Sequence, residues 1–105
     1  MTTPEKKVKD TAVKILKELK AYHFFPATHG YGRSGVPDII CCYNGLFLAI
    51  ECKAGKGKTT ALQDREIQRI KDAHGVALIV NEENVDDLQR LIRNELVKIR
   101  IDEWT

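Results

Sequence analysis

Three residues with the chemistry of a metal-assisted hydrolase lie on neighbouring segments of this sequence. Asp38 follows Pro37 at the start of one apolar run, and Glu51 and Lys53 stand two positions apart at the end of the next. Two carboxylates can hold a hard divalent cation in an oxygen cage, and an ammonium group beside them can orient or deprotonate water and offset phosphate charge. The residue types therefore indicate phosphodiester hydrolysis, with a nuclease as the leading hypothesis.

Glu51 and Lys53 would face one site, because side chains two apart on a strand point to the same side. One alternative is that both are the solvated end of an edge strand. However, the preceding run from Leu46 to Ile50 is apolar at every position, which is typical of a central buried strand. Charges that continue such a strand need a partner or a metal, since unpaired buried charge is costly.

A hairpin would bring Asp38 alongside Glu51. The Asn-Gly pair at positions 44 and 45 is the strongest short hairpin signal, and it separates the two apolar runs. Counting outward from this turn, Tyr43 pairs with Leu46, and Asp38 falls opposite Glu51. A bulge would shift this register.

The segment from Gly35 to Lys53 resembles the core of the PD-(D/E)xK nuclease superfamily, because Pro37-Asp38 and Glu51-Cys52-Lys53 fill its two defining motifs. Within that superfamily the chain is most similar to the virus-type replication-repair nuclease domain, VRR-NUC, in its standalone form. The resemblance extends from the first predicted helix through Val80. The ordered combination of motifs is more specific than either motif alone.

This resemblance implies an α/β, restriction-endonuclease-like core, with a mixed β-sheet flanked by helices in the order α-β-β-β-α-β-α-β. It also implies hydrolysis of DNA with Mg²⁺ or Mn²⁺, the ions that oxygen donors favour over zinc. Asp38 and Glu51 would be direct metal ligands, and the carbonyl of Cys52 a further one. Lys53 would position or activate the water.

Glu5 has two interpretations. Thr2 and Glu5 fit a capping box at the start of a helix that we expect to reach about Ala21, and an acid in the first turn also suits the helix dipole. Glu5 also heads the apolar stripe of this helix, and the resemblance implies a metal ligand there, directly or through water. The predicted stripe consists of Val8, Ala12, Ile15, Leu19 and Tyr22.

Gln63 likewise has a structural and a functional interpretation. Thr60 and Gln63 fit a second capping box, at the start of a helix expected from about Ala61 to Ala73. Capping alone would explain both residues. In the resembled family the glutamine belongs to the active site, where it would orient water or phosphate.

Two loops carry candidate DNA contacts. The glycine-rich loop from His29 to Gly35 would deliver Tyr31, Arg33 and Ser34 to nucleic acid, although an ordinary connection is an equal alternative. The basic loop after Lys53 and the helix that follows would add Lys56, Lys58, Arg65 and Arg69 to a phosphate-binding patch. By contrast, we interpret the lysines of the first helix as a solvated face.

The remaining elements follow from hydrophobic pattern. We expect a short strand from Tyr22 to Ala27 and a buried strand from Val76 to Val80, which is parallel to the strand before it because a helix intervenes. A last helix would span about Glu83 to Asn94. The alternating segment from Leu96 to Ile101 would then form an edge strand.

Composition indicates one small domain spanning residues 1–105. The chain has 43% hydrophobic and 30% charged residues, and its net charge of +2 is compatible with a polyanionic partner without being diagnostic. Cys41, Cys42 and Cys52 lie in apolar runs, so we expect buried, reduced thiols and a reducing compartment. No apolar stretch approaches membrane-spanning length, which predicts a cytoplasmic protein of phage or bacterial type with no membrane partner.

The expected partner is DNA, and the expected assembly is a homodimer. One domain offers one site, whereas coordinated cleavage of two strands calls for two, and standalone members of the resembled family look like dimeric junction-resolving nucleases. Branched DNA, such as Holliday junctions or flaps, is the predicted substrate. The alternatives are a sequence-specific restriction endonuclease, a catalytically silent nucleic-acid-binding module, and a structural protein in which Asp38, Glu51 and Lys53 form a buried ion pair.

Overall fold

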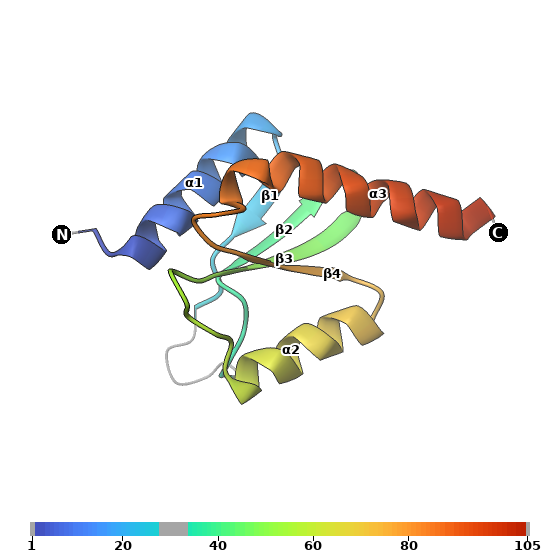
Figure 1. The fold of residues 1–105 in the computed structure, drawn as a ribbon. Helices are drawn as coiled ribbons and strands as arrows, with labels where there is room; N and C mark the ends of the chain where they lie inside the picture. Colours follow the sequence, from blue (N-terminus) through green and yellow to red (C-terminus); the bar gives the residue numbers. More distant parts are fainter. Residues whose placement is uncertain (1, 28–33, 105) are drawn as a thin grey trace.

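The computed structural model describes residues 2–27 and 34–104, with residues 100–104 through their backbone alone. A four-stranded sheet has the order β1-β2-β3-β4. Helices α1 and α3 cover one face of the sheet, and α2 lies on the other (Figure 1). The α/β, mixed-sheet prediction is therefore confirmed. The strands are β1 (Tyr22–Phe24), β2 (Ile39–Tyr43), β3 (Leu46–Cys52) and β4 (Val76–Val80); the helices are α1 (Pro4–Glu18), α2 (Ala61–Asp72), the short 3₁₀ helix η1 (Val85–Asp87) and α3 (Leu88–Trp104).

The β2–β3 hairpin has the predicted register. Tyr43 pairs with Leu46, and Ile39 pairs with Ile50, without a bulge between them. Asn44 and Gly45 have φ angles of 52° and 81°, the pair of positive values that a type I′ turn requires. Because Asp38 directly precedes Ile39, this register continues to place it opposite Glu51.

The core lies between the sheet and the layer formed by α1 and α3. Alternate residues of β2 and β3 point into this layer, as period-two alternation requires. Here α1 contributes Val8, Ala12 and Leu16, α3 contributes Leu88 and Ile92, and the strands contribute Ile39, Cys41, Leu48, Ile50, Cys52 and Val80. Burial of this apolar face fixes α1 against β3, which decides where the start of α1 meets the sheet.

Helix α2 connects β3 to β4, and these two strands are parallel as predicted. Thr60 caps α2: its hydroxyl accepts from the Gln63 N–H, and the Gln63 side chain accepts from the Thr60 N–H. The start of α2 lies directly against Gly35. A Cβ atom on Gly35 would stand 2.5 Å from the carbonyl carbon of Leu62 and 2.8 Å from the backbone nitrogen of Gln63. Only glycine allows this approach of the chain just before Pro37-Asp38.

The predicted edge strand from Leu96 to Ile101 is wrong, because α3 continues through this segment to Trp104. Leu88, Ile92, Leu96 and Ile99 also repeat at helical spacing, and the sequence has no glycine or proline after Gly75 to end the helix. A salt bridge of 3.4 Å between Lys98 and Glu95 adds local support. The helix period therefore overrides the short alternating pattern.

The predicted bounds and buried residues of α1 and β1 also differ from the structure. Helix α1 ends at Glu18 rather than near Ala21. Near its end, Leu16 is fully buried, and Ile15, which was predicted to hold that place, is only partly buried against the core. The positive φ of Lys20 turns the chain out of the helix. Tyr22 is 73% exposed on β1, which stops at Phe24 rather than Ala27.

Cys41 and Cys52 are buried as predicted, and burial raises the pKa of each thiol to about 12. Cys42 is exposed instead, since it points to the opposite sheet face, which α1 and α3 do not cover. Among the described residues, no helix is long and apolar enough to cross a membrane.

Gly35→Ala should destabilise the protein far more than Gly45→Ala. Both glycines have positive φ, but a Cβ at Gly45 meets nothing within 4 Å, whereas one at Gly35 collides with the backbone of α2. We expect a loss of about 2–4 kcal/mol of unfolding free energy at Gly35 and of about 1 kcal/mol at Gly45. Urea denaturation of both variants measures the difference. Equal losses would show that the contact with α2 is not tight.

Candidate active site

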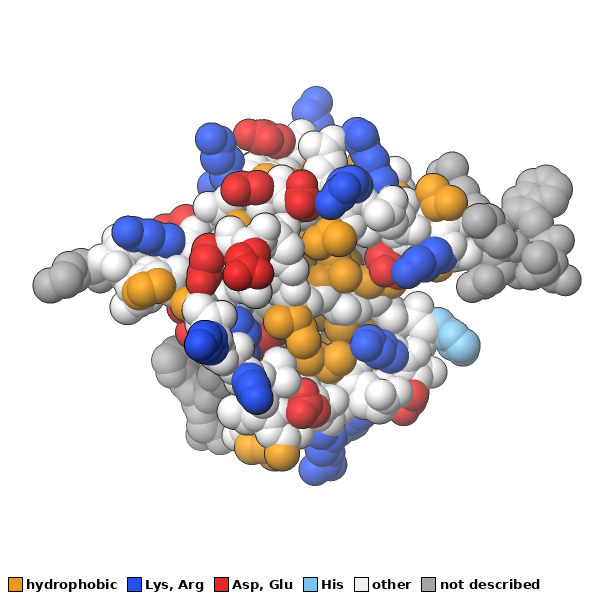
Figure 2. Space-filling model, viewed as in Figure 1, with side chains coloured by type: hydrophobic (Ala, Val, Ile, Leu, Met, Phe, Trp, Pro, Cys, Tyr) orange, Lys and Arg blue, Asp and Glu red, His pale blue; other side chains and the backbone are white. Residues whose placement is uncertain are grey.

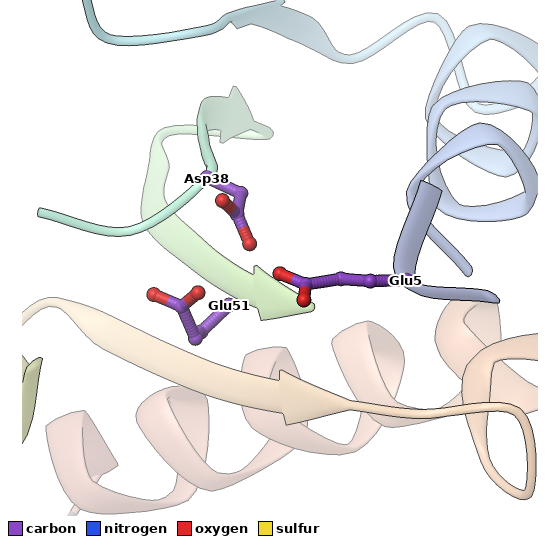
Figure 3. Close-up of side chains that lie close together, drawn as sticks. All are labelled: Glu5, Asp38 and Glu51. Carbon is purple, nitrogen blue, oxygen red and sulfur yellow. The ribbon is translucent and has the colours of Figure 1, made fainter. Parts of the chain in front are cut away.

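Three carboxylates from separate parts of the chain meet at one end of the sheet. Glu5 extends from the first turn of α1, Asp38 precedes β2, and Glu51 lies near the end of β3 (Figure 3). One carboxylate oxygen of each lies within 4.8 Å of the others. Glu5 is exposed, Asp38 is half-buried and Glu51 is buried, so the cluster leads from solvent into the protein.

The carboxylate of Asp38 is held by the backbone of β3. The N–H of Cys52 donates a hydrogen bond of 2.8 Å to Asp38 Oδ2. A bond from a backbone amide to a carboxylate is charge-assisted and fixes the acceptor in place. Since Cys52 directly follows Glu51, this bond couples the position of one carboxylate to the strand that carries the other.

Glu51 is 2% exposed, and its Oε2 has no hydrogen-bond partner among the described residues. Burial is the main cause that raises its pKa to about 8, followed by a hydrogen bond with Asp38 and the negative charges of Asp38 and Glu5; Lys53 opposes them. A buried, unpartnered carboxylate oxygen is costly. The protein alone does not satisfy this group near neutral pH.

A divalent cation would satisfy it. The donor set consists of carboxylate oxygens, which suit Mg²⁺ or Mn²⁺, and Glu51, which carries the unpartnered Oε2, is a member of the cluster. Asp38, Glu51 and Glu5 are therefore the residues that would hold the ion. Cys52 contributes no thiolate, because burial raises its thiol pKa to about 12; its carbonyl oxygen stays a predicted ligand.

Lys53 lies just beyond β3, where its backbone N–H donates to Val80 O at 2.9 Å. Its positive charge lowers the pKa of Glu51, which agrees with the two side chains sharing one side of the strand. Within the described part of the chain, Lys53 forms an ion pair with neither Asp38 nor Glu51. The buried ion pair of the structural alternative is therefore not formed.

Gln63 is a capping residue in this structure. Its Oε1 accepts from the Thr60 N–H at 2.9 Å, and its own N–H donates to Thr60 Oγ1 at 3.2 Å. Its Nε2 makes no hydrogen bond to the described residues, so this group is available to a ligand, and the predicted catalytic role stays a prediction.

The predicted DNA contacts are only partly described. Tyr31 and Arg33 lie outside the described residues, and Ser34 is exposed beside Gly35. Lys56 and Lys58 are exposed in the loop that leaves β3 at the same end of the sheet as the cluster, and Arg65 is exposed on α2. Figure 2 shows Lys and Arg side chains spread over the visible face rather than gathered in one patch.

Lys9 is a cation beside the cluster that was not predicted from the sequence. Lys9, assigned above to a solvated face, lines a groove of about 600 Å³ with Glu5 and Asp38. The signal was present, because Lys9 stands four residues after Glu5 and residues at this spacing share a helix face. Phe25, which also lines the groove, had no such signal, since its place depends on how β1 packs beside α1.

Without metal, the protein should lose stability as pH rises from about 4.5 to about 8, the interval between the ordinary and raised pKa of Glu51. In this interval the folded state binds more protons than the unfolded state, so unfolding free energy falls with pH. We expect a fall on the order of a few kcal/mol, which Glu51→Gln should largely remove. Melting temperatures in EDTA at several pH values measure it.

The exposed Glu18→Gln on α1 is the matched control and should keep the slope of the parent protein. Mg²⁺ should raise the melting temperature of the parent most near pH 8, where Glu51 ionises. An unchanged pH slope in Glu51→Gln would show that this carboxyl group is not the one that titrates.

Comparison with known proteins gives matches at the level of structure. Neither a scan of protein families nor a search of curated proteins gave a match. A solved structure described as "VRR_NUC domain" is 23% identical, with a TM-score of 0.70 over 85% of this chain and 97% of its own. Another, "VRR_NUC domain protein", is 18% identical, with a TM-score of 0.67 over 89% of this chain and 88% of its own. This chain therefore has the fold of a VRR-NUC domain.

Proposed function

We propose that the protein is a divalent-metal-dependent nuclease of the PD-(D/E)xK type that hydrolyses DNA. The observation that carries this proposal is the unpartnered, buried Oε2 of Glu51 in a cluster with Asp38 and Glu5. The Asp38 and Glu51-Cys52-Lys53 motifs and the VRR-NUC fold support it from sequence and from architecture. Buried polar atoms that serve stability alone are normally hydrogen-bonded, so an unpartnered buried oxygen favours a role in binding.

When bound, Mg²⁺ or Mn²⁺ would polarise the phosphate and lower the pKa of water. The protein itself performs three other tasks. Asp38 is held beside Glu51 by the Cys52 N–H, which donates to its Oδ2. Lys53, unpaired with either carboxylate, can orient the attacking water and offset phosphate charge. Gln63 can donate through Nε2 while its Oε1 caps α2.

DNA affinity would come from exposed cations near this end of the sheet. Lys56 and Lys58 follow Lys53 in a loop ordered by a bond from the Gly57 N–H to Ala54 O of 2.9 Å. Arg65 would contact phosphate from α2, as would Ser34 and the undescribed Arg33 and Tyr31 from the glycine-rich loop. Such contacts supply affinity and register without sequence information, so we propose selection by DNA structure.

We further propose a homodimer that acts on branched DNA. Two strands of a junction need two sites, and a two-fold axis would supply the second. An exposed apolar row on the sheet face away from α1 and α3 supports association. Cys42 pairs with Tyr22 on one side and Phe47 on the other, and all three side chains are exposed. Apolar side chains gathered on one surface commonly mark an interface.

Asp38→Ala and Glu51→Gln should each lower DNA cleavage by at least about 100-fold, because each removes a metal ligand. The assay is Mg²⁺- or Mn²⁺-dependent cleavage of single strands, duplexes, flaps and four-way junctions. The exposed Glu18→Gln on α1, which does not line the groove beside the cluster, is a control that should cleave normally. A folded parent protein that binds DNA but cleaves none of these substrates with either metal would instead be a silent binding module.

The protein should be a dimer in solution, and it should bind a four-way junction more tightly than a linear duplex of equal length. Light scattering measures the first property and competition binding the second. Phe47→Lys should shift the protein toward monomer, since Phe47 is 47% exposed in the apolar row. The exposed Val97→Lys on α3 is the control. A monomeric parent without junction preference would contradict both proposals and leave a general nuclease.

A further inference from the structure

A groove opens beside the carboxylate cluster, between α1 and the start of β2. Its volume is about 600 Å³, which is in the range of small-molecule sites. Glu5 and Asp38 form its wall at the cluster. Lys9 and Phe25 line it too, and they have no part in the metal chemistry described above.

Lys9 is a cation to which the described residues offer no anionic partner. Its Nζ lies over the Phe25 ring, 4.4 Å from the ring centroid, in a cation–π contact, and within the described residues it forms no ion pair or hydrogen bond. Lys6, on the same helix, is instead paired with Asp10 at 3.2 Å. Lys9 is therefore free to bind an anion next to three carboxylates that would otherwise repel one.

Phe25 presents a fixed aromatic surface in the same groove. It follows β1, its ring meets that of His23 edge-on at 6.0 Å between centroids, and it is 48% exposed. Leaving half of an apolar ring in water is unfavourable in free energy, so a ligand that covers the ring would be stabilised. A groove that holds this ring and an ammonium group matches a ligand with one flat apolar part and one negative part.

We propose that this groove holds an unpaired nucleotide adjoining the phosphate to be cleaved, with its base stacked on the part of the Phe25 ring that Lys9 leaves exposed and its phosphate at Lys9. The inference rests on the proposed nuclease function and specifies its substrate at the cut. A base within a duplex has neighbours stacked on both of its faces, so only an unstacked base can use the ring. Lys9 and Phe25 would then select DNA with a frayed or unpaired nucleotide at the site.

Binding of a short single-stranded oligonucleotide that carries 2-aminopurine tests this proposal without cleavage. Titrations are made in Ca²⁺ and repeated in EDTA, with fluorescence quenching reporting stacking and anisotropy reporting affinity. Phe25→Leu should weaken binding by roughly tenfold and abolish quenching, whereas Phe25→Trp should retain both. Lys9→Gln should weaken binding and reduce its salt dependence.

The chain offers matched controls for both residues. Phe24 is 47% exposed and adjacent in sequence, but it lines a different groove, so Phe24→Leu should bind and quench normally. Lys6→Gln should have less effect than Lys9→Gln, because Asp10 already neutralises Lys6. Melting temperatures confirm that each variant is folded. Equal effects of Phe24→Leu and Phe25→Leu, or no effect of either, would overturn the proposal.

Failure of this inference can be distinguished from failure of the nuclease proposal. A protein that quenches 2-aminopurine through Phe25 but cuts no DNA would retain the nucleotide site and lose the proposed activity. A protein whose cleavage depends on Asp38 and Glu51, but whose Phe25→Leu variant binds and quenches like the parent, would retain the activity and lose the nucleotide site.

Discussion

The carboxylate of Glu51 is buried beside two other carboxylates, and the rest of the site is arranged around that unfavourable placement. Burial raises its pKa to about 8, so near neutral pH the group must take up a proton or a cation. A strand end exposed to water would not impose this choice. The apolar run of β3 carries Glu51 into the interior, and the hairpin register brings Asp38 opposite it. The cluster that could hold a cation thus follows from how the sheet is built.

Position is controlled by backbone contacts more than by side-chain pairing. The Cys52 N–H holds Asp38, and the absence of a side chain at Gly35 lets the segment before Asp38 lie against the start of α2. The capping box of Thr60 and Gln63 fixes that same helix start. A glutamine placed there can serve the helix through one end of its amide and a ligand through the other, so its structural and functional interpretations are compatible.

Local patterns predicted the hairpin and the approach of Asp38 to Glu51, because turn chemistry and strand alternation are short-range properties; the place of Glu5 beside them was expected from the family resemblance. The Asn-Gly turn fixed the pairing of Tyr43 with Leu46, and the position opposite Glu51 followed by counting. The C-terminal segment was less predictable: residues 96–101 alternate and also continue the helical spacing of α3, and local pattern does not decide between the two. The hydrogen bond from Cys52 to Asp38 was also beyond prediction, since it depends on the completed register.

Helix α1 shows why a lysine-rich helix cannot be interpreted as one surface. Most of its lysines are solvated, yet the packing of Val8, Ala12 and Leu16 on the core turns Glu5 and Lys9 toward the sheet end. One apolar stripe therefore sets the positions of a carboxylate and an unpaired ammonium group on the adjoining face. The carboxylate completes the proposed cation site, and the ammonium group would offset the charge that this site presents to phosphate. Both positions follow from the same hydrophobic contacts, so a change in the core of α1 would disturb the proposed metal site and the proposed anion site together.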